Sequence, residues 1–304
     1  MTSSLPVHPP LLLSQGALLF CSSLILLYGC GDFGHEGSRG PYSVPETSDI
    51  QPACSPDGRY VAYRHEDNVG ADTTYPTGLY LIETNGTGRR LLVEGRAALP
   101  AWSPNGEWIA FTAGAIYAIH VSDDSLFRIT NFAGFFPSWS PDGLYLCCDR
   151  SGTQDTVGIW IVSISGSSAE RFDYGSQAHW SPDGEKFVYE GVPDPYSGPQ
   201  IFTIRISDRT ERRMLTNNGR NNSNMAPKWS PQGDRITWFI TASANDQSVW
   251  VMESDGSLQR EVIDGFDPCW SNDEQRIVFS RTMGKQVVLW SVRHDGSDAQ
   301  QLTH

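Results

Sequence analysis

Serine and histidine are the residue types to examine first for catalysis, because a hydrolase needs a nucleophile beside a base. A serine nucleophile on a strand–helix elbow is flanked as Gly-x-Ser-x-Gly, and this pentapeptide does not occur in the 304 residues. His179, His294 and His304 therefore have no recognisable serine partner. We interpret His179 as a packing or polar lining residue, with a ligand-binding or catalytic role as the alternative.

The cysteines and aspartates are not arranged for a metal. The six cysteines form no C-x-x-C pair, and no two histidines stand at helical ligand spacing. Asp57, Asp142 and Asp183 are each followed directly by glycine and then a hydrophobic strand, whereas a calcium loop needs several oxygen ligands close together in the sequence. We interpret these aspartates as turn-capping residues, and we expect no metal and no cofactor.

These aspartates belong to a stretch that recurs along the chain. Residues 137–143 read PSWSPDG, and six copies of this frame can be aligned. Their central positions are 37 to 49 residues apart and are occupied by Cys54, Trp102, Trp139, Trp180, Trp229 and Trp270. A period of this length is typical of a repeat architecture.

Each copy begins a unit of four short hydrophobic strands. In the third unit, the strands are expected at 136–140, 144–148, 158–163 and 169–172. Six such units predict an all-β fold, a six-bladed β-propeller with four antiparallel strands per blade. The predicted blades are 51–93, 99–131, 135–173, 177–217, 225–264 and 266–304. We expect the repeated tryptophans to pack between neighbouring blades.

The first strands of a propeller surround its central channel, whose mouth is the default ligand site. The first-strand starts are Gln51, Leu99, Phe136, Gln177, Ala226 and Asp267. From these and their neighbours we select as tentative ligand-binding residues Gln51, Phe136, Gln177, His179, Lys228 and Asp267. The set mixes charge, amide and aromatic groups without a carboxylate pair, which favours recognition of a peptide or glycan over catalysis.

Two cysteines lie where the ring of blades must close. Cys54 is on the first strand of the first unit and Cys269 is on the first strand of the sixth. An oxidising compartment would allow a ring-closing disulfide between them, and two buried thiols are the alternative. Cys147 and Cys148 are adjacent in one strand and point to opposite faces, so we expect them to be unlinked.

The N-terminal residues differ in composition from the repeats. Leu11 to Leu27 is mostly apolar and is followed by Gly29-Cys30, the form of an export signal. Residues 1–30 resemble a lipoprotein signal peptide with Cys30 as the lipidated anchor, and a plain secretory signal or an uncleaved anchor helix are the alternatives. Residues 31–50 are rich in glycine and polar residues and predict a flexible tether, whose last residues could add a strand to the fold.

The repeat frame, with its Ile-Ala-Phe, Ile-Tyr and Arg-x-Leu-Thr segments, resembles the TolB-type propeller repeat. The resemblance covers residues 51–303. It implies the propeller fold, but members of this type range from periplasmic proteins to propellers of proteases, so it implies no single function. The N-terminal domain of TolB and a downstream hydrolase domain are not part of the resemblance.

Charge and motifs together narrow the function. A net charge of −13 should repel phosphate backbones, so we expect no nucleic acid partner. The first hypothesis is a non-enzymatic, exported, membrane-tethered monomer that binds a protein, a peptide or an envelope polymer. The alternative is an enzyme, an extracellular glycan hydrolase or lyase, that uses the propeller mouth. A subunit of a larger export or sensing complex is a third possibility.

Overall fold

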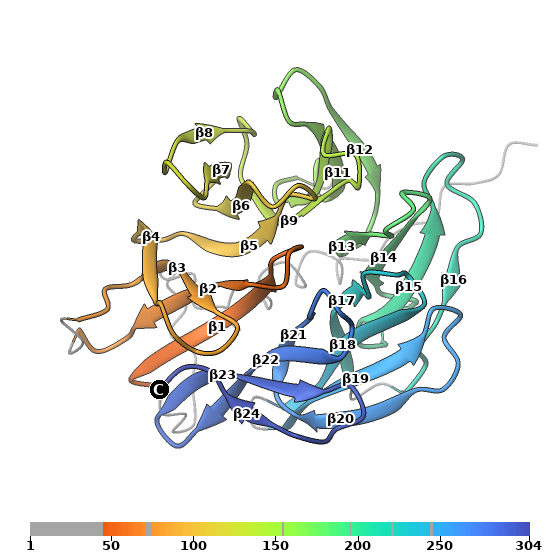
Figure 1. The fold of residues 1–304 in the computed structure, drawn as a ribbon. Helices are drawn as coiled ribbons and strands as arrows, with labels where there is room; N and C mark the ends of the chain where they lie inside the picture. Colours follow the sequence, from red (N-terminus) through yellow and green to blue (C-terminus); the bar gives the residue numbers. More distant parts are fainter. Residues whose placement is uncertain (1–44, 71–73, 154, 195, 220–221, 244–245) are drawn as a thin grey trace, which may run out of the picture.

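The computed structural model describes residues 45–70, 74–153, 155–194, 196–219, 222–243 and 246–304, and within them the chain forms six four-stranded units around one axis (Figure 1). The first unit consists of β1 (Thr47–Cys54), β2 (Tyr60–Asp67), β3 (Gly78–Glu83) and β4 (Arg90–Glu94). The second consists of β5 (Ala98–Trp102), β6 (Trp108–Thr112), β7 (Ile116–His120) and β8 (Leu126–Arg128). The third consists of β9 (Gly134–Trp139), β10 (Tyr145–Arg150), β11 (Gly158–Ser163) and β12 (Ala169–Asp173).

The last three units follow the same order. They are β13 (Ser176–Trp180), β14 (Lys186–Gly191), β15 (Gln200–Arg205) and β16 (Arg213–Met214); β17 (Ser223–Trp229), β18 (Arg235–Ser243), β19 (Asp246–Glu253) and β20 (Arg260–Asp264); and β21 (Phe266–Trp270), β22 (Arg276–Met283), β23 (Gln286–Arg293) and β24 (Gln300–Gln301). Consecutive strands within each unit pair antiparallel. The predicted propeller with four-stranded antiparallel blades is therefore confirmed, and the units are called blades 1 to 6 below.

The repeated Ser-Pro-Asp-Gly stretch forms the turn between the first and second strands. In blade 3, the Asp142 carboxylate accepts hydrogen bonds from the Ser140 hydroxyl at 2.5 Å and from the Leu144 backbone N–H at 2.9 Å. Gly143 takes a positive φ of 71°, which glycine adopts without steric cost. Asp57 and Asp183 make the equivalent bonds in their own turns, so these aspartates cap turns as the sequence predicts.

The tryptophans of the repeat lie in the seams between blades. The Trp102 indole donates to the Ala53 carbonyl of blade 1 at 2.9 Å, and the Trp139 indole donates to the Ala101 carbonyl of blade 2 at 3.0 Å. Trp139 also shares a hydrophobic cluster with Trp108 of the preceding blade. Because second and third strands are buried on both faces, hydrophobic packing between blades holds the ring together.

The ring is closed by strand pairing between its two ends. At one end of β23, Trp290 and Ser291 pair with the short β24. At the other end, Thr47 and Ser48 of β1 pair with β23 in parallel, which joins blades 1 and 6 in one sheet. The tether predicted for residues 31–50 thus gives way to strand at Thr47, because the backbone of these residues finds partners on β23.

The predicted signal peptide with Cys30, and residues 31–44 of the tether, lie outside the described residues.

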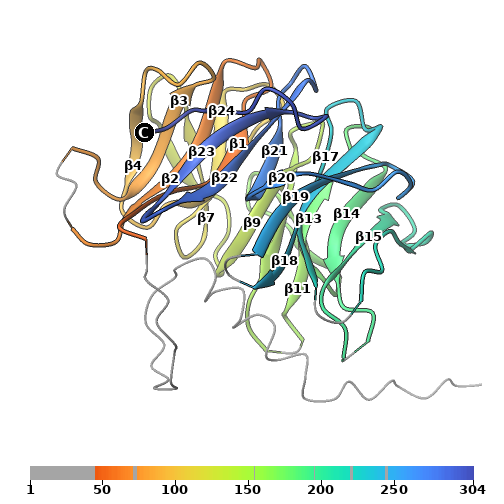
Figure 2. The ribbon, with the colours of Figure 1, turned by 90° about the horizontal axis from the view of Figure 1, so that it is seen from below.

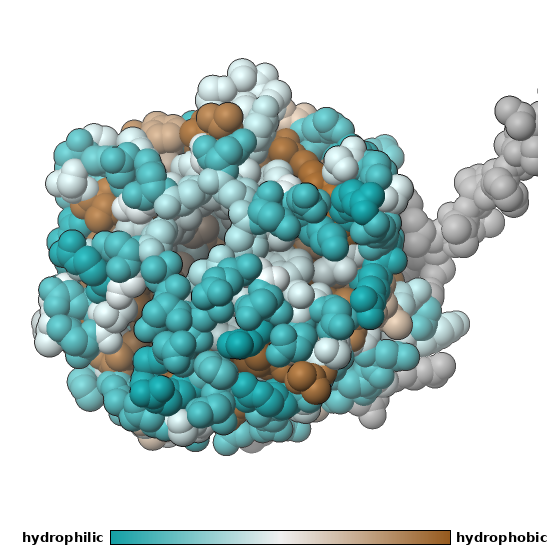
Figure 3. All heavy atoms as spheres, turned by 45° about the vertical axis from the view of Figure 1, so that its right-hand side comes forward, coloured by the Kyte–Doolittle hydropathy of each residue, from teal (hydrophilic) through white to brown (hydrophobic). Residues whose placement is uncertain are grey.

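The part of the chain that is described contains no helix of the length and hydropathy needed to span a membrane. In the turned view of Figure 2 the strands are inclined, as β19, β22 and β23 show. The face in Figure 3 is mostly hydrophilic, with hydrophobic residues in small separate patches.

Candidate functional site

The innermost strand of every blade contains a β-bulge at the same place. Six residues there take φ angles between 51° and 58°, and they are Gln51, Leu99, Phe136, Gln177, Ala226 and Asp267. In each blade the register between the first and second strands breaks across this residue. A bulge bends its strand and redirects the side chains beside it. These six are the residues that the sequence analysis placed at the first-strand starts.

The residue after the bulge is proline in five of the six blades. A bulge interrupts the ladder, so a residue without an N–H is tolerated there. Pro52, Pro100 and Pro137 occupy this place in the first three blades, whereas blade 4 has Ala178. The first residue of the repeat frame is thus explained by the local backbone.

The bulges bring the predicted site residues to one narrow central cavity of about 70 Å³. Its lining includes all six tentative ligand-binding residues, Gln51, Phe136, Gln177, His179, Lys228 and Asp267. The remaining lining is supplied mainly by the neighbouring prolines and by Leu99, Ser138 and Ala226. The cavity therefore offers amide, imidazole, ammonium, carboxylate and aromatic groups to a ligand.

Two side-chain nitrogen atoms in the cavity lining have no hydrogen-bond partner among the described residues. Gln177 is 5% exposed, and its Nε2 amide donates no hydrogen bond there. His179 Nδ1 is also buried and unpartnered. A buried polar atom without a partner costs free energy, so both atoms are available to a bound group that reaches the channel.

His179 is held neutral by its surroundings. Burial, and secondarily the charge of Lys228, lower the pKa of His179 to about 3. The Lys228 ammonium in turn donates to the Pro52 carbonyl at 3.3 Å. At neutral pH the imidazole can donate or accept one hydrogen bond at each nitrogen according to its tautomer, but it is too weakly basic to take up a proton.

Two carboxyl groups that the sequence analysis missed support the bulges from the neighbouring blade. Asp149 on β10 accepts from the Gln177 backbone N–H at 3.0 Å, and Glu190 on β14 accepts from the Ala226 N–H at 2.7 Å. Burial raises the pKa of Asp149 and of Glu190 to about 8. The available signal was their shared position, the fifth residue of a second strand.

Gln51 plays the same supporting part between blades 1 and 2, because its side-chain carbonyl accepts from the Leu99 N–H at 2.9 Å. Bulge N–H groups are thus bound by side chains of the preceding blade at three of the seams. The geometry of the cavity wall depends on contacts between blades as well as within them.

Cys54 and Cys269 lie together where blades 1 and 6 meet. The Cys54 thiol donates to the Cys269 carbonyl at 3.9 Å, and both cysteines belong to one hydrophobic cluster. The two are thiols in this structure, as are the buried Cys147 and Cys148. A hydrogen bond in which the Cys54 thiol is the donor to Cys269, together with burial, raises the pKa of Cys54. The two cysteines are therefore in contact, and the disulfide between them stays a hypothesis.

Histidine, cysteine and carboxylate side chains do not gather into a group of three suited to a metal ion anywhere in the described parts of the chain. The lining of the central cavity contains a single carboxylate, that of Asp267.

Comparison with known proteins identifies the repeat. Residues 137–304, more than half of the chain, match the family model of the TolB beta propeller domain. The chain belongs to the TolB β-propeller family. This confirms the resemblance of the repeat frame for the propeller, while the predicted lipoprotein signal lies outside the match.

Sequence relatives share part of this TolB-like chain. An uncharacterized protein of Agrobacterium fabrum is 27% identical over 181 residues, which cover 56% of this chain and 59% of that protein. The Tol-Pal system protein TolB of Francisella tularensis is 25% identical over 216 residues, which cover 52% of this chain and 49% of that protein. The chain thus spans about half the length of the curated relatives that it matches.

Solved structures agree on the fold. TolB from Acinetobacter baumannii has a TM-score of 0.68 at 20% identity and covers 86% of this chain, which covers 64% of that one. An oligogalacturonate lyase from Vibrio parahaemolyticus has a TM-score of 0.56 at 13% identity, with coverage of 86% and 78%. Identities this low show the shared propeller alone, because one fold supports many functions.

Proposed function

We propose that this TolB-like propeller is a non-enzymatic, exported binding or scaffold protein that recognises a protein, peptide or envelope polymer at its channel mouth. The observation that carries the proposal is the convergence of six bulged strands on one cavity with unpartnered polar groups at Gln177 and His179. A peptide or sugar supplies the amide and hydroxyl groups that such atoms bind. The relatives named as Tol-Pal system proteins make an envelope protein the first partner to test.

The chemistry of the cavity supports binding rather than catalysis. His179 has a pKa of about 3 and cannot serve as a base at neutral pH. Asp149 and Glu190, whose pKa values suit an acid or base, are bound to the backbone N–H groups of the next blade and do not line the cavity. A glycan hydrolase or lyase remains the alternative, because the cavity lining contains one carboxylate, that of Asp267, as well as His179.

The proposal includes attachment to a membrane through lipidated Cys30. The apolar stretch ending in Gly29-Cys30 supports it, and residues 31–44 would link the anchor to the first strand. Metabolic labelling with a radioactive fatty acid should mark the full-length protein and not its Cys30→Ala variant. Cleavage of the signal peptide at another residue, or a wild-type chain without label, would refute the lipid anchor. Neither result would bear on the proposed binding site in the channel.

Affinity capture from an envelope extract tests the binding function. A chain beginning at residue 45 should retain one stoichiometric partner, identified by mass spectrometry, and the double variant Gln177→Ala/His179→Ala should lose it at least tenfold. Leu258→Ala is the matched control, because Leu258 is 76% exposed and lies outside the cavity. Equal capture of the partner by all three chains would mean that it binds outside the channel cavity. Cleavage of an extracellular polysaccharide by the wild type, lost in Asp267→Asn, would favour the alternative function as a glycan hydrolase or lyase.

A further inference from the structure

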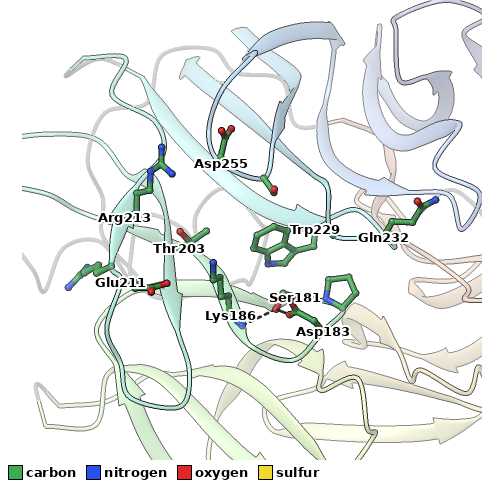
Figure 4. Close-up of a pocket in the computed structure, with 13 residues that line it drawn as sticks. Ser181, Asp183, Lys186, Thr203, Glu211, Arg213, Trp229, Gln232 and Asp255 are labelled. Atoms are coloured by element: carbon green, nitrogen blue, oxygen red, sulfur yellow. Dashed lines mark hydrogen bonds between the residues drawn. The ribbon is translucent and has the colours of Figure 1, made fainter.

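A second and larger cavity lies between blades 4 and 5, apart from the channel mouth. This seam cleft has a volume of about 570 Å³. It is lined by the turn at Ser181–Asp183, by Lys186 and Thr203, by residues 211–213 and, from blade 5, by Trp229, Gln232, Gly233, Ser254 and Asp255. Figure 4 shows Trp229 across the middle of the cleft, with Lys186 and Thr203 on the side of blade 4.

The seam between blades 2 and 3 shows how this space is filled elsewhere. There Trp139, the repeat tryptophan of blade 3, belongs to one hydrophobic cluster with Trp108, Phe127 and Ile164. Trp108 begins the second strand of blade 2, and its ring lies 5.0 Å from that of Phe127 on the fourth strand. Ile164 directly follows the third strand of blade 3. Three hydrophobic side chains thus close this seam around its tryptophan.

The same three places carry polar residues around Trp229. Lys186 begins the second strand of blade 4, Arg213 lies on its fourth strand, and Ser254 directly follows the third strand of blade 5. Two cations and a small hydroxyl therefore replace two aromatic rings and an isoleucine. Since these side chains fill less apolar volume, the seam opens beside the indole.

Trp229 has an unused hydrogen-bond donor in this cleft. It is 7% exposed, and its indole Nε1–H has no partner among the described residues. At two other seams the equivalent donor binds a carbonyl of the preceding blade. Trp180 and Trp270 share the unpaired donor, so what distinguishes Trp229 is the open cleft that it lines.

The carboxylates of the cleft are engaged, whereas two of its cations are not. Asp183 accepts from the Glu185 N–H at 3.0 Å, Asp255 accepts from the Ser257 N–H at 2.9 Å, and Glu211 is paired with Arg205. Lys186 and Arg213 form no direct salt bridge with any described residue, and they act only at longer range on Asp183 and Asp255. In a chain of net charge −13, two cations beside an indole favour an anionic ligand.

We propose that the seam cleft is a second binding site and that it takes an acidic oligosaccharide, a chain of sugars that carry carboxylates. The indole of Trp229 offers an apolar surface for the C–H face of a sugar ring and an N–H for one of its oxygens. Lys186 and Arg213 bind the carboxylates, and Thr203 and Gln232 are within the same lining to bind hydroxyl groups. The seam cleft and the channel cavity share no lining residue, so binding at each site can be tested separately.

Calorimetric titration with an alginate hexamer, which consists only of uronate sugars, tests the site. The wild-type chain should bind it, and the double variant Lys186→Ala/Arg213→Ala should bind at least about tenfold more weakly, as expected for loss of charged hydrogen bonds. Trp229→Phe should keep most of the affinity, because the ring is retained, whereas Trp229→Ala should lose it. Arg59→Ala, which removes an exposed cation from a blade 1 turn, is the matched control and should bind as the wild type does.

Three further titrations separate the proposal from its rivals. Maltohexaose, which is neutral, and hexaglutamate, which is charged but has no sugar ring, should each bind at least about tenfold more weakly than the alginate hexamer. The channel variant Gln177→Ala/His179→Ala should bind the hexamer normally. Absence of binding, equal binding of hexaglutamate, or full affinity in a folded Lys186→Ala/Arg213→Ala protein would overturn the proposal.

Discussion

Lys228 of blade 5 reaches across the central channel and donates to the Pro52 carbonyl of blade 1, at 3.3 Å. Blade 6 separates these two blades around the ring, so the bond spans the channel and not a seam. The ammonium therefore narrows the passage and places a positive charge beside His179. A ligand that enters deeply must displace it or bind it.

Replacing this lysine should change the titration of His179. In Lys228→Met the side chain keeps similar length but loses its charge, so one cause of the lowered pKa is removed. We expect the pKa of His179 to rise from about 3 and to stay below its ordinary value of about 6.5, because burial is the larger cause. Histidine NMR signals recorded against pH measure it, and an unchanged pKa would mean that the ammonium does not face the ring.

Asp149 and Glu190 predict a stability that falls as pH rises. Their pKa values in the folded chain are about 8, above the ordinary values of about 4, so the folded state holds these protons more tightly. Their contribution to stability is therefore full below pH 4 and is lost as pH rises to 8. Glu190 also feels the charges of Asp149 and Asp267, which strengthens the effect.

The test is a set of thermal melts between pH 6 and pH 9. The double variant Asp149→Asn/Glu190→Gln keeps a side-chain carbonyl to accept from the Gln177 and Ala226 N–H groups. It should melt a few degrees above the wild type at pH 9, and the difference should shrink toward pH 6. Asp142→Asn is a useful control because the pKa of Asp142 is lowered, not raised. Parallel curves for the wild type and the double variant would contradict the prediction.

The sequence predicts the ring of blades because each of the six copies of the frame predicts the same turn and the same four strands. The turn at Asp142-Gly143 and the proline after Phe136 are determined by the backbone of one strand pair. Both can therefore be explained from a single repeat. Asp149 and the seam cleft depend on contacts between blades, which no single repeat contains. Aligning the copies would have pointed to the cleft, since Lys186 stands where the first three blades carry Tyr60, Trp108 and Tyr145. It would not have singled out Asp149, because that position is polar in most blades.

The cysteine pair predicts a disulfide in the oxidised protein. Cys54 and Cys269 are already in contact, and a bond between them would join blades 1 and 6 over 215 residues of chain. The loop-entropy model gives a stabilisation of about 5 kcal/mol for so long a loop. Peptide mapping without reductant should recover the linked pair, and reduction should lower the free energy of unfolding by that amount. Equal stability with and without reductant would mean that Cys54 and Cys269 are two buried thiols with no disulfide between them.

The repeat tryptophans can be tested at Trp139. Trp139→Ala removes a large ring from the seam between blades 2 and 3 and should cost about 3–5 kcal/mol of the free energy of unfolding. Trp139→Phe keeps a ring but loses the bond to the Ala101 carbonyl, so its cost should be nearer 1 kcal/mol. Denaturant titration of the two variants and the wild type gives both values, and equal costs would show that the ring does not stabilise the seam.

Closure of the ring depends on a few backbone contacts at the start of β1. The Glu46 N–H donates to the Lys285 carbonyl at 2.7 Å, and Thr47 and Ser48 pair with β23. A chain beginning at residue 49 loses these bonds, whereas one beginning at residue 45 keeps them. The shorter chain also loses the pairing of Thr47 and Ser48 with β2 and the bond from the Asn68 N–H to the Glu46 carbonyl. At about 1 kcal/mol for each backbone hydrogen bond, it should be less stable by about 4–6 kcal/mol.

Hydrogen exchange locates this loss. Amides of Gln286 and Val287 should exchange faster in the chain that begins at residue 49, because their end of β23 becomes an open edge. Trp290 and Ser291 should keep their protection, since they pair with β24 and do not need β1. Lys285→Ala in the longer chain separates the contributions, because it removes only the exposed salt bridge to Glu46, which should be worth less than 1 kcal/mol. Uniform exchange along β23 in both chains would mean that another contact closes the ring.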